Sequence, residues 1–218
     1  MRTIVTTNDR SHSIQSEIYG ESYHSSFGAI TESKHIFITN GIEKIQKNDI
    51  AVYEAGFGTG LNAYLCMLWA AEKKVKVMYS AAELFPVEIS IASKLNYSEL
   101  LGDNEENFIK LHTTRWDSFE EISPFFCLMK TRTDIGKYIP DEKTDVIFFD
   151  AFSPAVQPEL WNRELFSRLQ KMLNQDGIFV SYCVKGTVKK ALREAGFRVY
   201  VLPGPPGKRH MLYAVNDN

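Results

Sequence analysis

From about residue 50 onward, short apolar runs alternate with segments whose apolar positions recur at helical spacing. The short apolar runs predict buried strands, and the segments with helical spacing predict helices. We expect strands at 50–55, 76–82, 125–131, 144–149, 178–183, 197–202 and 211–215. We expect helices at 61–72, 86–94, 104–115, 159–173 and 187–195. Strands that alternate with helices form a mostly parallel sheet covered on both faces, so the pattern predicts an α/β doubly wound fold.

The first 45 residues follow a different pattern, which is polar and short. Ile14–Glu17 and His35–Thr39 are expected to be weak strands, and Asn40-Gly41 is typical of a turn. We therefore expect residues 1–45 to form a small extension packed on a main domain at 46–218.

Composition narrows the class of protein. The 218 residues are 44% hydrophobic and 24% charged, with a net charge of −2, which is ordinary for a packed soluble domain and excludes disordered, collagen-like and coiled-coil chains. The first ten residues lack the apolar core of a signal peptide, and the longest apolar stretch, 63–71, is too short to span a membrane. Cys66, Cys127 and Cys183 have no metal-knuckle spacing. We expect a cytoplasmic protein with buried thiols, no metal and no membrane contact.

The first strong strand ends in a glycine-rich turn, VYEAGFGTGLN at 52–62. Glycines at 56, 58 and 60 let the backbone turn tightly and approach a ligand, and the following helix directs free N–H groups toward it. Leu61 occupies the position where a nicotinamide fingerprint needs its third glycine, so we rank that class of enzyme last. Glu83 stands 23 positions past Gly60, at the end of the next strand, where a carboxylate can accept the hydroxyls of a ribose.

This combination resembles motif I and the ribose-binding acid of the class I S-adenosylmethionine-dependent methyltransferases. The resemblance implies S-adenosylmethionine as cofactor, with Glu54 supporting the turn or the amino group and Asp134 on the adenine amino group. Asp134 is equally typical of a helix N-cap before Ile135. The implied cofactor site consists of Glu54, Gly56, Phe57, Gly58, Thr59, Gly60, Asn62, Glu83, Asp134 and Asp150.

Asp150 is the candidate catalytic residue. It follows the apolar strand VIFF and begins the segment DAFSPAVQPELW, so it is expected at the ligand-facing edge of the sheet. A carboxylate there can hold an amine next to a methyl donor, while Phe152 and Pro154 form an apolar lip. An alkylamine with a pKa of about 10 must lose a proton before attack. The alternative for Asp150 is an N-cap of the following helix.

Four segments carry a narrower resemblance: EAGFGTGLN, AAELFP, FFDAFSPAVQPELW and LREAGFRVYVLPGPPGKRHML. Together they resemble the methyltransferase domain of the bacterial bifunctional enzyme that completes methylaminomethyl-2-thiouridine at the tRNA wobble position. The resemblance implies N-methylation of aminomethyl-(2-thio)uridine, with Asp150 matching the acid implicated in catalysis. No second glycine fingerprint follows residue 83, so we expect a stand-alone methyltransferase without flavin, acting on a tRNA anticodon stem-loop and needing no obligatory protein partner.

Charge distribution supports a nucleic-acid partner. Residues 184–210 contain seven basic residues and a single acid, Glu194. Such clustering is typical of phosphate binding. We expect Lys185, Lys208 and Arg209 to contact substrate together with Phe152 and Pro154, and an aromatic side chain (Trp161, Phe152 or Tyr23) to stack on the base. A solvated helix face is the alternative for the lysines near residue 190, and His210 is the one histidine we would test.

Two other function classes remain open from the sequence. One is a methyltransferase or aminopropyltransferase that acts on a small-molecule amine, since the latter class also uses an acid after the fourth strand. The other is a non-catalytic nucleotide-binding module that scaffolds RNA; it would lack an acid at position 150, and Asp150 is present.

Overall fold

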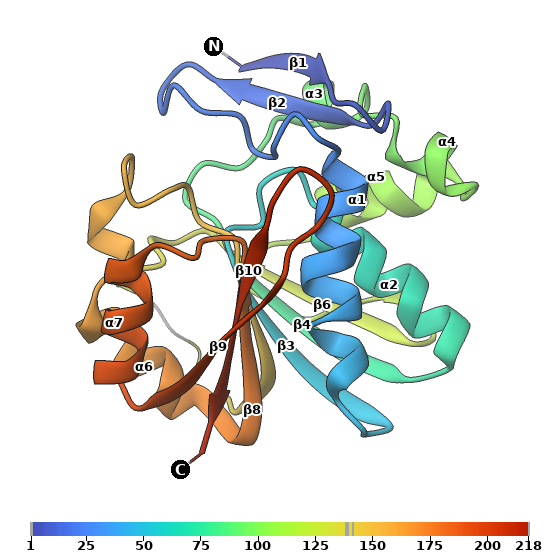
Figure 1. Cartoon of the computed structure of the whole chain (residues 1–218). Coiled ribbons are helices and arrows are strands. Elements are labelled where there is room, and N and C mark those ends of the chain that lie inside the picture. The colour runs from blue at the N-terminus through green and yellow to red at the C-terminus, as the bar shows by residue number, and fades with distance from the viewer. Residues whose placement is uncertain (1, 138–139, 141, 218) are drawn as a thin grey trace.

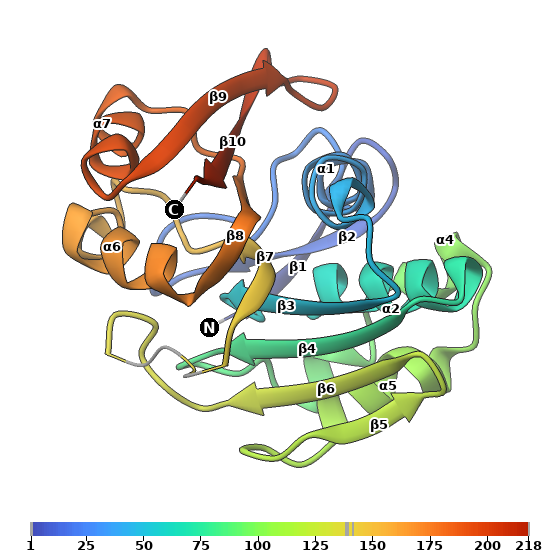
Figure 2. The ribbon, with the colours of Figure 1, turned by 90° about the horizontal axis from the view of Figure 1, so that it is seen from below.

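The computed structural model describes residues 2–217 except 138, 139 and 141, and it contains an eight-stranded sheet (Figure 1). Figure 2 shows the strand order β5-β6-β4-β3-β7-β8-β10-β9. Neighbours from β6 to β8 pair in parallel, whereas β5 and β10 run antiparallel to their neighbours. The strands are β3 (Asp49–Ala55), β4 (Lys76–Ala82), β5 (Glu120–Ser123), β6 (Phe126–Thr131), β7 (Thr144–Phe149), β8 (Leu173–Ser181), β9 (Phe197–Pro203) and β10 (His210–Asn216). The expected mostly parallel α/β fold is confirmed.

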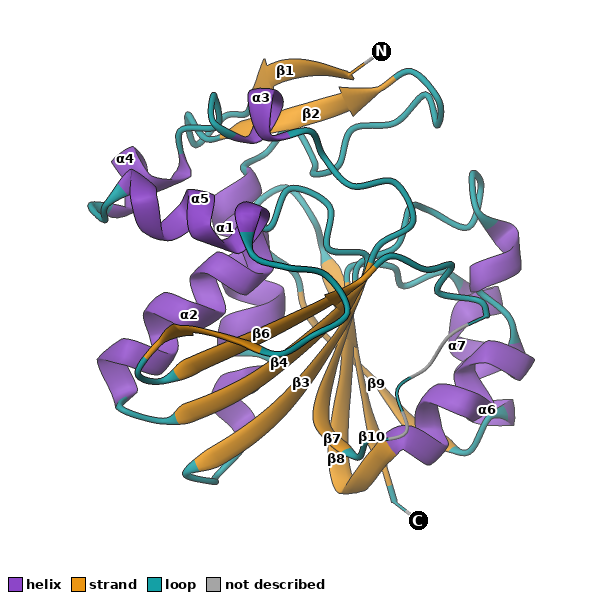
Figure 3. Cartoon of the chain, turned by 180° about the vertical axis from the view of Figure 1, so that it is seen from behind, coloured by secondary structure: helices purple, strands orange, loops and turns teal. Residues whose placement is uncertain are grey.

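Helices cover both faces of this sheet (Figures 1 and 3). On one face, α2 (Leu61–Lys73) and α5 (Glu105–Thr113) bury Tyr64 and Phe108, whose ring centroids lie 5.1 Å apart. On the other face, α6 (Arg163–Met172) and α7 (Gly186–Glu194) enclose a second core. Shorter helical pieces are α3 (Ile89–Ala92), α4 (Tyr97–Leu101) and η3 (Pro158–Leu160).

The N-terminal residues form a hairpin and a helical segment. Strands β1 (Arg2–Thr6) and β2 (His12–Ser16) pair antiparallel in a sheet of their own, which lies over the carboxyl ends of the central strands (Figures 1 and 3). Helix α1 (Ala29–Ser33) continues into a π-helical turn, η1 (Lys34–Thr39), followed by η2 (Ile42–Lys44). The division into domains at residue 45 stays a prediction.

The strand expected at His35–Thr39 is wrong, because this segment is η1. Its Ile-Phe-Ile run has high strand propensity, but three consecutive residues, Ile36, Phe37 and Ile38, are buried where η1 meets α2 and β8. Burial in the tertiary structure therefore outweighs the local preference.

Two expected helices begin later than predicted. In the 86–94 segment only Ile89–Ala92 is helical, because the Arg2 guanidinium takes the carbonyls of Phe85 and Pro86 as acceptors. The helix expected from residue 159 starts at Arg163, where the Asn162 side chain accepts a hydrogen bond from the backbone N–H of Leu165 at 2.9 Å. The edge strands β1 and β5 were not predicted.

The topology places a crevice between the carboxyl ends of β3 and β7. The chain passes from β3 outward to β4 and β6 on one side, and later returns to β7 on the other side of β3. The two strand ends stay joined, since the N–H of Asp150 donates to the carbonyl of Ala55 at 3.0 Å. Open parallel sheets bind ligands at such a switch point.

Candidate active site

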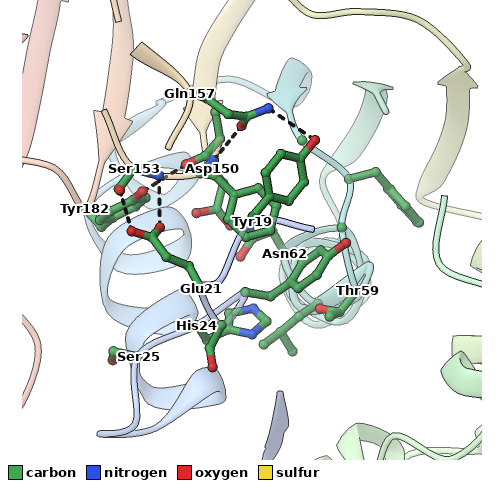
Figure 4. A pocket seen from close by; sticks show the side chains of 18 of the residues that line it. Tyr19, Glu21, His24, Ser25, Thr59, Asn62, Asp150, Ser153, Gln157 and Tyr182 are labelled. Atoms are coloured by element: carbon green, nitrogen blue, oxygen red, sulfur yellow. Dashed lines mark hydrogen bonds between the residues drawn. The ribbon is translucent and has the colours of Figure 1, made fainter. Parts of the chain in front are cut away.

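A cavity of about 680 Å³ opens at this switch point (Figure 4). Its volume lies within the range of about 300–1,000 Å³ typical of small-molecule sites. Loops after β3, β4, β6, β7 and β8 contribute to its walls, as do residues 5–7, 19 and 21–26 of the N-terminal segment. The predicted site residues that line it are Gly56, Phe57, Gly58, Thr59, Asn62, Glu83, Asp134, Asp150, Phe152 and Lys208. Those outside the lining are Glu54, Gly60, Pro154, Lys185 and Arg209.

The glycine turn has the conformation that its residues predict. Gly56, Gly58 and Gly60 have φ angles of 96°, 52° and 74°, which L side chains rarely adopt. A Cβ on Gly56 would lie 3.0 Å from the carbonyl oxygen of Asp150, and one on Gly58 would lie 3.0 Å from the Tyr23 ring. The missing side chains therefore allow the β7 loop and Tyr23 to close around the turn.

Glu83 is held in a defined orientation beside this turn. Its Oε2 accepts the N–H of Gly58 at 2.9 Å, and its Oε1 accepts the N–H of Phe85 at 2.8 Å. Each carboxylate oxygen keeps a further lone pair. Two fixed acceptors side by side match the two hydroxyls of a ribose.

Asn62 links two carboxyl groups at the floor of the cavity. Its Nδ2 donates to Oε1 of Glu54 at 2.9 Å and to Oδ2 of Asp150 at 2.8 Å. Glu54 is fully buried, and burial raises its pKa well above the ordinary value. Glu54 lies behind the cavity wall, so its position suits support of the turn. Oδ1 of Asn62 is buried and accepts no hydrogen bond within the described part of the chain.

Asp150 faces the cavity directly after β7 (Figure 4). Burial raises its pKa to about 7, and the negative charge of Glu32 acts in the same direction. The hydrogen bond from Asn62 and the charge of Lys208 act against this rise. A carboxyl group poised near neutrality can hold a cation in its ionised form and can also accept a proton.

The N-terminal segment supplies cavity residues that the sequence did not indicate. Glu21 accepts hydrogen bonds from Oγ of Ser153 at 2.7 Å and from its N–H at 3.4 Å (Figure 4). The rings of Tyr19 and Phe152 lie 4.3 Å apart between centroids. Nε2 of Gln157 donates to the Tyr19 hydroxyl at 3.5 Å. These contacts join segments more than 130 positions apart, and no local pattern signals them.

Two more lining residues, Glu32 and Tyr182, were also missed. Tyr182 directly follows β8 at the same sheet edge as Asp150, so its place at a strand end was the available signal. Glu32 lies on α1, and it had no signal because α1 was not predicted.

The expectation that Lys208 and Arg209 act together on phosphate is not supported for Lys208. Its Nζ lies 2.8 Å from Oε2 of Glu32 and 4.7 Å from the centroid of the Tyr182 ring, inside the cavity. Arg209 is exposed outside it. Elsewhere in the basic segment Arg198 pairs with Asp217 at 2.5 Å and Lys190 approaches Glu194 at 3.8 Å. The segment therefore carries less unpaired positive charge than its composition indicates.

Other predicted roles differ in detail. Oδ1 of Asp134 accepts the N–H of Gly136 at 2.8 Å, so it caps a turn instead of a helix, and it lines the cavity. Trp161 is buried against Phe149 with centroids 4.9 Å apart, so it belongs to the core and cannot stack on a base. His210 is exposed at the start of β10, outside the cavity lining.

Within residues 2–217, leaving out 138, 139 and 141, no three His, Cys, Asp or Glu side chains are grouped to hold a metal ion. None of the helices described there has the length and apolar character needed to cross a membrane.

Residues 109–217 match the family described as S-adenosyl-L-methionine-dependent methyltransferase. The tRNA 5-methylaminomethyl-2-thiouridine biosynthesis bifunctional protein MnmC of Azoarcus sp. (strain BH72) is 30% identical over 214 residues, which cover 90% of this chain and 33% of the relative. The chain therefore spans about a third of the length of the curated relatives that it matches.

MNMC2 from Aquifex aeolicus and spermidine synthase from Thermotoga maritima are among the solved structures similar to this chain. MNMC2 from Aquifex aeolicus superposes with a TM-score of 0.82 at 27% identity, covering 99% of this chain and 70% of the other. Spermidine synthase from Thermotoga maritima gives a TM-score of 0.59 at 13% identity, covering 98% and 71% respectively, and it shows the shared fold alone.

The sheet order, the glycine turn, the oriented acid on β4 and the cavity at the switch point define a Rossmann-like nucleotide-cofactor enzyme. Its residues fit S-adenosylmethionine: the turn is a cradle that any Cβ would narrow, Glu83 presents two oriented acceptors, and Asn62 leaves a buried oxygen to be satisfied. The chain belongs to the S-adenosyl-L-methionine-dependent methyltransferases. The resemblance to the class I enzymes is confirmed.

Proposed function

We propose that this chain is an N-methyltransferase that converts aminomethyl-(2-thio)uridine to methylaminomethyl-(2-thio)uridine at the tRNA wobble position. The observation that carries the proposal is Asp150, a half-buried carboxyl group facing a cofactor-type cavity at the switch point. Two comparisons support the choice of substrate: MnmC of Azoarcus carries tRNA methylaminomethyl-2-thiouridine biosynthesis in its name, and the similarity to MNMC2 covers 99% of this chain.

The cofactor would lie along the ends of β4 and β3. Glu83 would bind the ribose, and Asp134, which lines the same cavity, would bind the adenine amino group. The glycine turn and Asn62 would surround the methionyl part. When bound, the cofactor supplies an electrophilic methyl group on sulfur.

Asp150 would bind and orient the acceptor amine. Its ionised carboxylate holds the ammonium next to the methyl donor, and orientation of this kind contributes roughly 7–11 kcal/mol to such displacements. Because burial raises the pKa of Asp150 to about 7, this group is a stronger base than an ordinary aspartate. The difference from an alkylamine pKa of about 10 narrows accordingly, which lowers the free-energy cost of moving the proton from the ammonium to Asp150.

The remaining predicted substrate residues follow the strands at the edge of the sheet that carries the cavity. Phe152 lines it and offers a ring to the nucleobase, and Pro154 follows in the same loop. Lys185 directly precedes α7 at the end of β8, and Arg209 lies in the loop between β9 and β10. Since β9 runs parallel to β8, both cations stand at the sheet edge that carries Asp150 and are placed to meet tRNA phosphates. A tRNA substrate would place the enzyme in the cytoplasm.

The test is methyl transfer from labelled S-adenosylmethionine to total tRNA that lacks its wobble methyl group, followed by nucleoside analysis. Label in methylaminomethyluridine, absent with Asp150→Asn, is the expected result. Labelled small amines without labelled tRNA would overturn the proposal and favour the small-molecule alternative. Cofactor binding without label in any amine would instead favour the non-catalytic module.

A further inference from the structure

The cavity contains an ion pair that cofactor binding does not require. Nζ of Lys208 and Oε2 of Glu32 lie 2.8 Å apart, with side chains 26% and 10% exposed. Lys208 and Glu32 are far apart in sequence, and both line the cavity together with Asp150 and Tyr182. Removing two charges from water costs free energy that a buried pair seldom recovers, so such a pair is weak as a stabilising device. Its position inside a ligand cavity points to recognition.

The sheet order places the pair on the acceptor side of the site. Along the carboxyl edge the contributing strands follow one another as β4 with Glu83, β3 with the glycine turn, β7 with Asp150 and β8 with Tyr182. The loop between β9 and β10, which carries Lys208, comes next. Asp150 thus separates the cofactor half from a second half formed by Tyr182, Lys208 and Glu32.

The pair has hydrogen-bonding capacity to spare. Oε2 of Glu32 accepts from Oγ of Ser25 at 2.6 Å as well as facing Lys208, whereas Oε1 accepts no hydrogen bond from the residues described. Lys208 uses one of its three N–H groups on Glu32 and lies over the ring of Tyr182. Tyr182 is itself fixed, because its hydroxyl donates to the carbonyl of Ala151 at 2.9 Å. A fixed acceptor and a fixed donor therefore stand side by side.

This pattern is complementary to one edge of a uracil ring, where the N3–H donor adjoins the O4 acceptor. We propose that Glu32 accepts the N3–H and that Lys208 donates to O4 of the acceptor base, so that the pair selects uracil over cytosine. Cytosine presents a lone pair at N3 and an amino group at position 4, which oppose both charges. Neither Glu32 nor Lys208 contacts position 2 of the ring in this arrangement, so an oxygen or a sulfur there is tolerated. This inference rests on the proposed function.

The test uses two short anticodon-loop RNAs, one with 5-aminomethyluridine and one with 5-aminomethylcytidine at the wobble position. The full chain with S-adenosylmethionine is expected to favour the uridine RNA in kcat/KM by about 10- to 100-fold, as for a bidentate base contact. Glu32→Gln, whose amide can donate to cytosine N3, is expected to reduce this ratio at least tenfold. Lys208→Met is expected to raise KM for the uridine RNA more than it lowers kcat.

Controls separate recognition from structure. Arg209→Met changes the neighbouring cation, outside the cavity, and is expected to leave the uridine-to-cytidine ratio unchanged. Cofactor affinity by calorimetry is expected to stay within about threefold for Glu32→Gln and Lys208→Met. A wild-type enzyme that does not distinguish the two RNAs would overturn the inference. A wild-type uridine-to-cytidine ratio of kcat/KM in both Glu32→Gln and Lys208→Met would also overturn it. If Glu32→Gln does not fold, the ratio measured for Lys208→Met is the deciding result. Failure of the wild type to methylate either RNA would refute the proposed function instead.

Discussion

At the scale of single residues, Asp150 shows how environment adapts a common side chain. Its carboxylate accepts a hydrogen bond from the Asn62 amide at 2.8 Å, and among the described residues no cation lies at hydrogen-bond distance from it. Burial therefore dominates and raises its pKa to about 7. A carboxyl group of this kind binds a cation more favourably than it keeps an unpaired negative charge.

We predict that Asp150→Asn lowers kcat/KM for methyl transfer by about 10²- to 10⁴-fold, the usual contribution of a positioned acid or base. Asparagine keeps the shape and can still accept the Asn62 hydrogen bond, so cofactor affinity is expected to change little. Calorimetric titration and single-turnover methylation measure the two quantities. If turnover persists at the wild-type rate, Asp150 has no catalytic role.

The raised pKa of Asp150 predicts opposite pH dependences for activity and for stability. Activity requires ionised Asp150, so kcat/KM is expected to fall with slope one as pH drops below about 7. The free energy of unfolding changes in the opposite direction. Because the pKa of Asp150 is higher in the folded state than its unfolded value of 3.8, stability decreases as pH rises from about 4 to 7. Thermal unfolding at pH 5 and pH 8 is expected to show a larger stabilising effect of Asp150→Asn at pH 8. An equal effect at both values would contradict the raised pKa.

At the scale of elements, the site depends on contact between the loop after β7 and the N-terminal segment. Glu21 binds both the N–H and the hydroxyl of Ser153, and Tyr19 packs on Phe152. Asp150 begins this loop, so the N-terminal segment also restrains the catalytic carboxyl group. The segment is thereby a wall of the site as well as a cover of the sheet edge.

We predict that Glu21→Ala lowers kcat/KM by about tenfold and also lowers the free energy of unfolding by roughly 1.5–3 kcal/mol, the usual contribution of a hydrogen bond to a charged group. Tyr19→Phe is the matched control, because it removes only the 3.5 Å contact with Gln157 and keeps the ring on Phe152. Steady-state kinetics with unfolding scans distinguish the variants. Equal activity of Glu21→Ala and wild type would show that the β7 loop holds Asp150 without this contact.

At the scale of the whole molecule, the sheet order brings the site residues that follow the central strands to one edge. Parallel strands present their carboxyl ends together, and the parallel direction of β9 adds the loop with Lys208 and Arg209 to that edge. Net charge is −2, so any attraction for RNA depends on local placement of cations and not on the total.

We predict that the double variant Lys185→Glu and Arg209→Glu weakens tRNA binding and reduces the salt slope of log K by about 1.5, since each phosphate contact contributes about 0.7–0.9. Arg198→Gln is the control, because Arg198 pairs with Asp217 at 2.5 Å, and its slope is expected to stay unchanged. Binding titrations between about 50 and 200 mM salt measure both. An unchanged slope in the double variant would assign tRNA contact to another surface.

The sequence by itself determined the strand–helix alternation, the glycine turn, Glu83 and Asp150. These features depend on short-range chemistry: an apolar run defines a buried strand, a glycine permits a positive φ, and a carboxylate at a strand end must face the ligand edge. The resemblance of the DAFSPAVQPELW segment narrowed the class further.

The tertiary structure alone decided which groups share the cavity and how each is charged. It made η1 a helix because Ile36, Phe37 and Ile38 are buried between elements that the local sequence does not contain. It paired Lys208 with Glu32, 176 positions away, and brought Glu21 to Ser153. Contacts of this kind depend on the path of the whole chain, and so do the pKa of Asp150 and the partner of each cation, because burial and electrostatic interaction are set by neighbours in space.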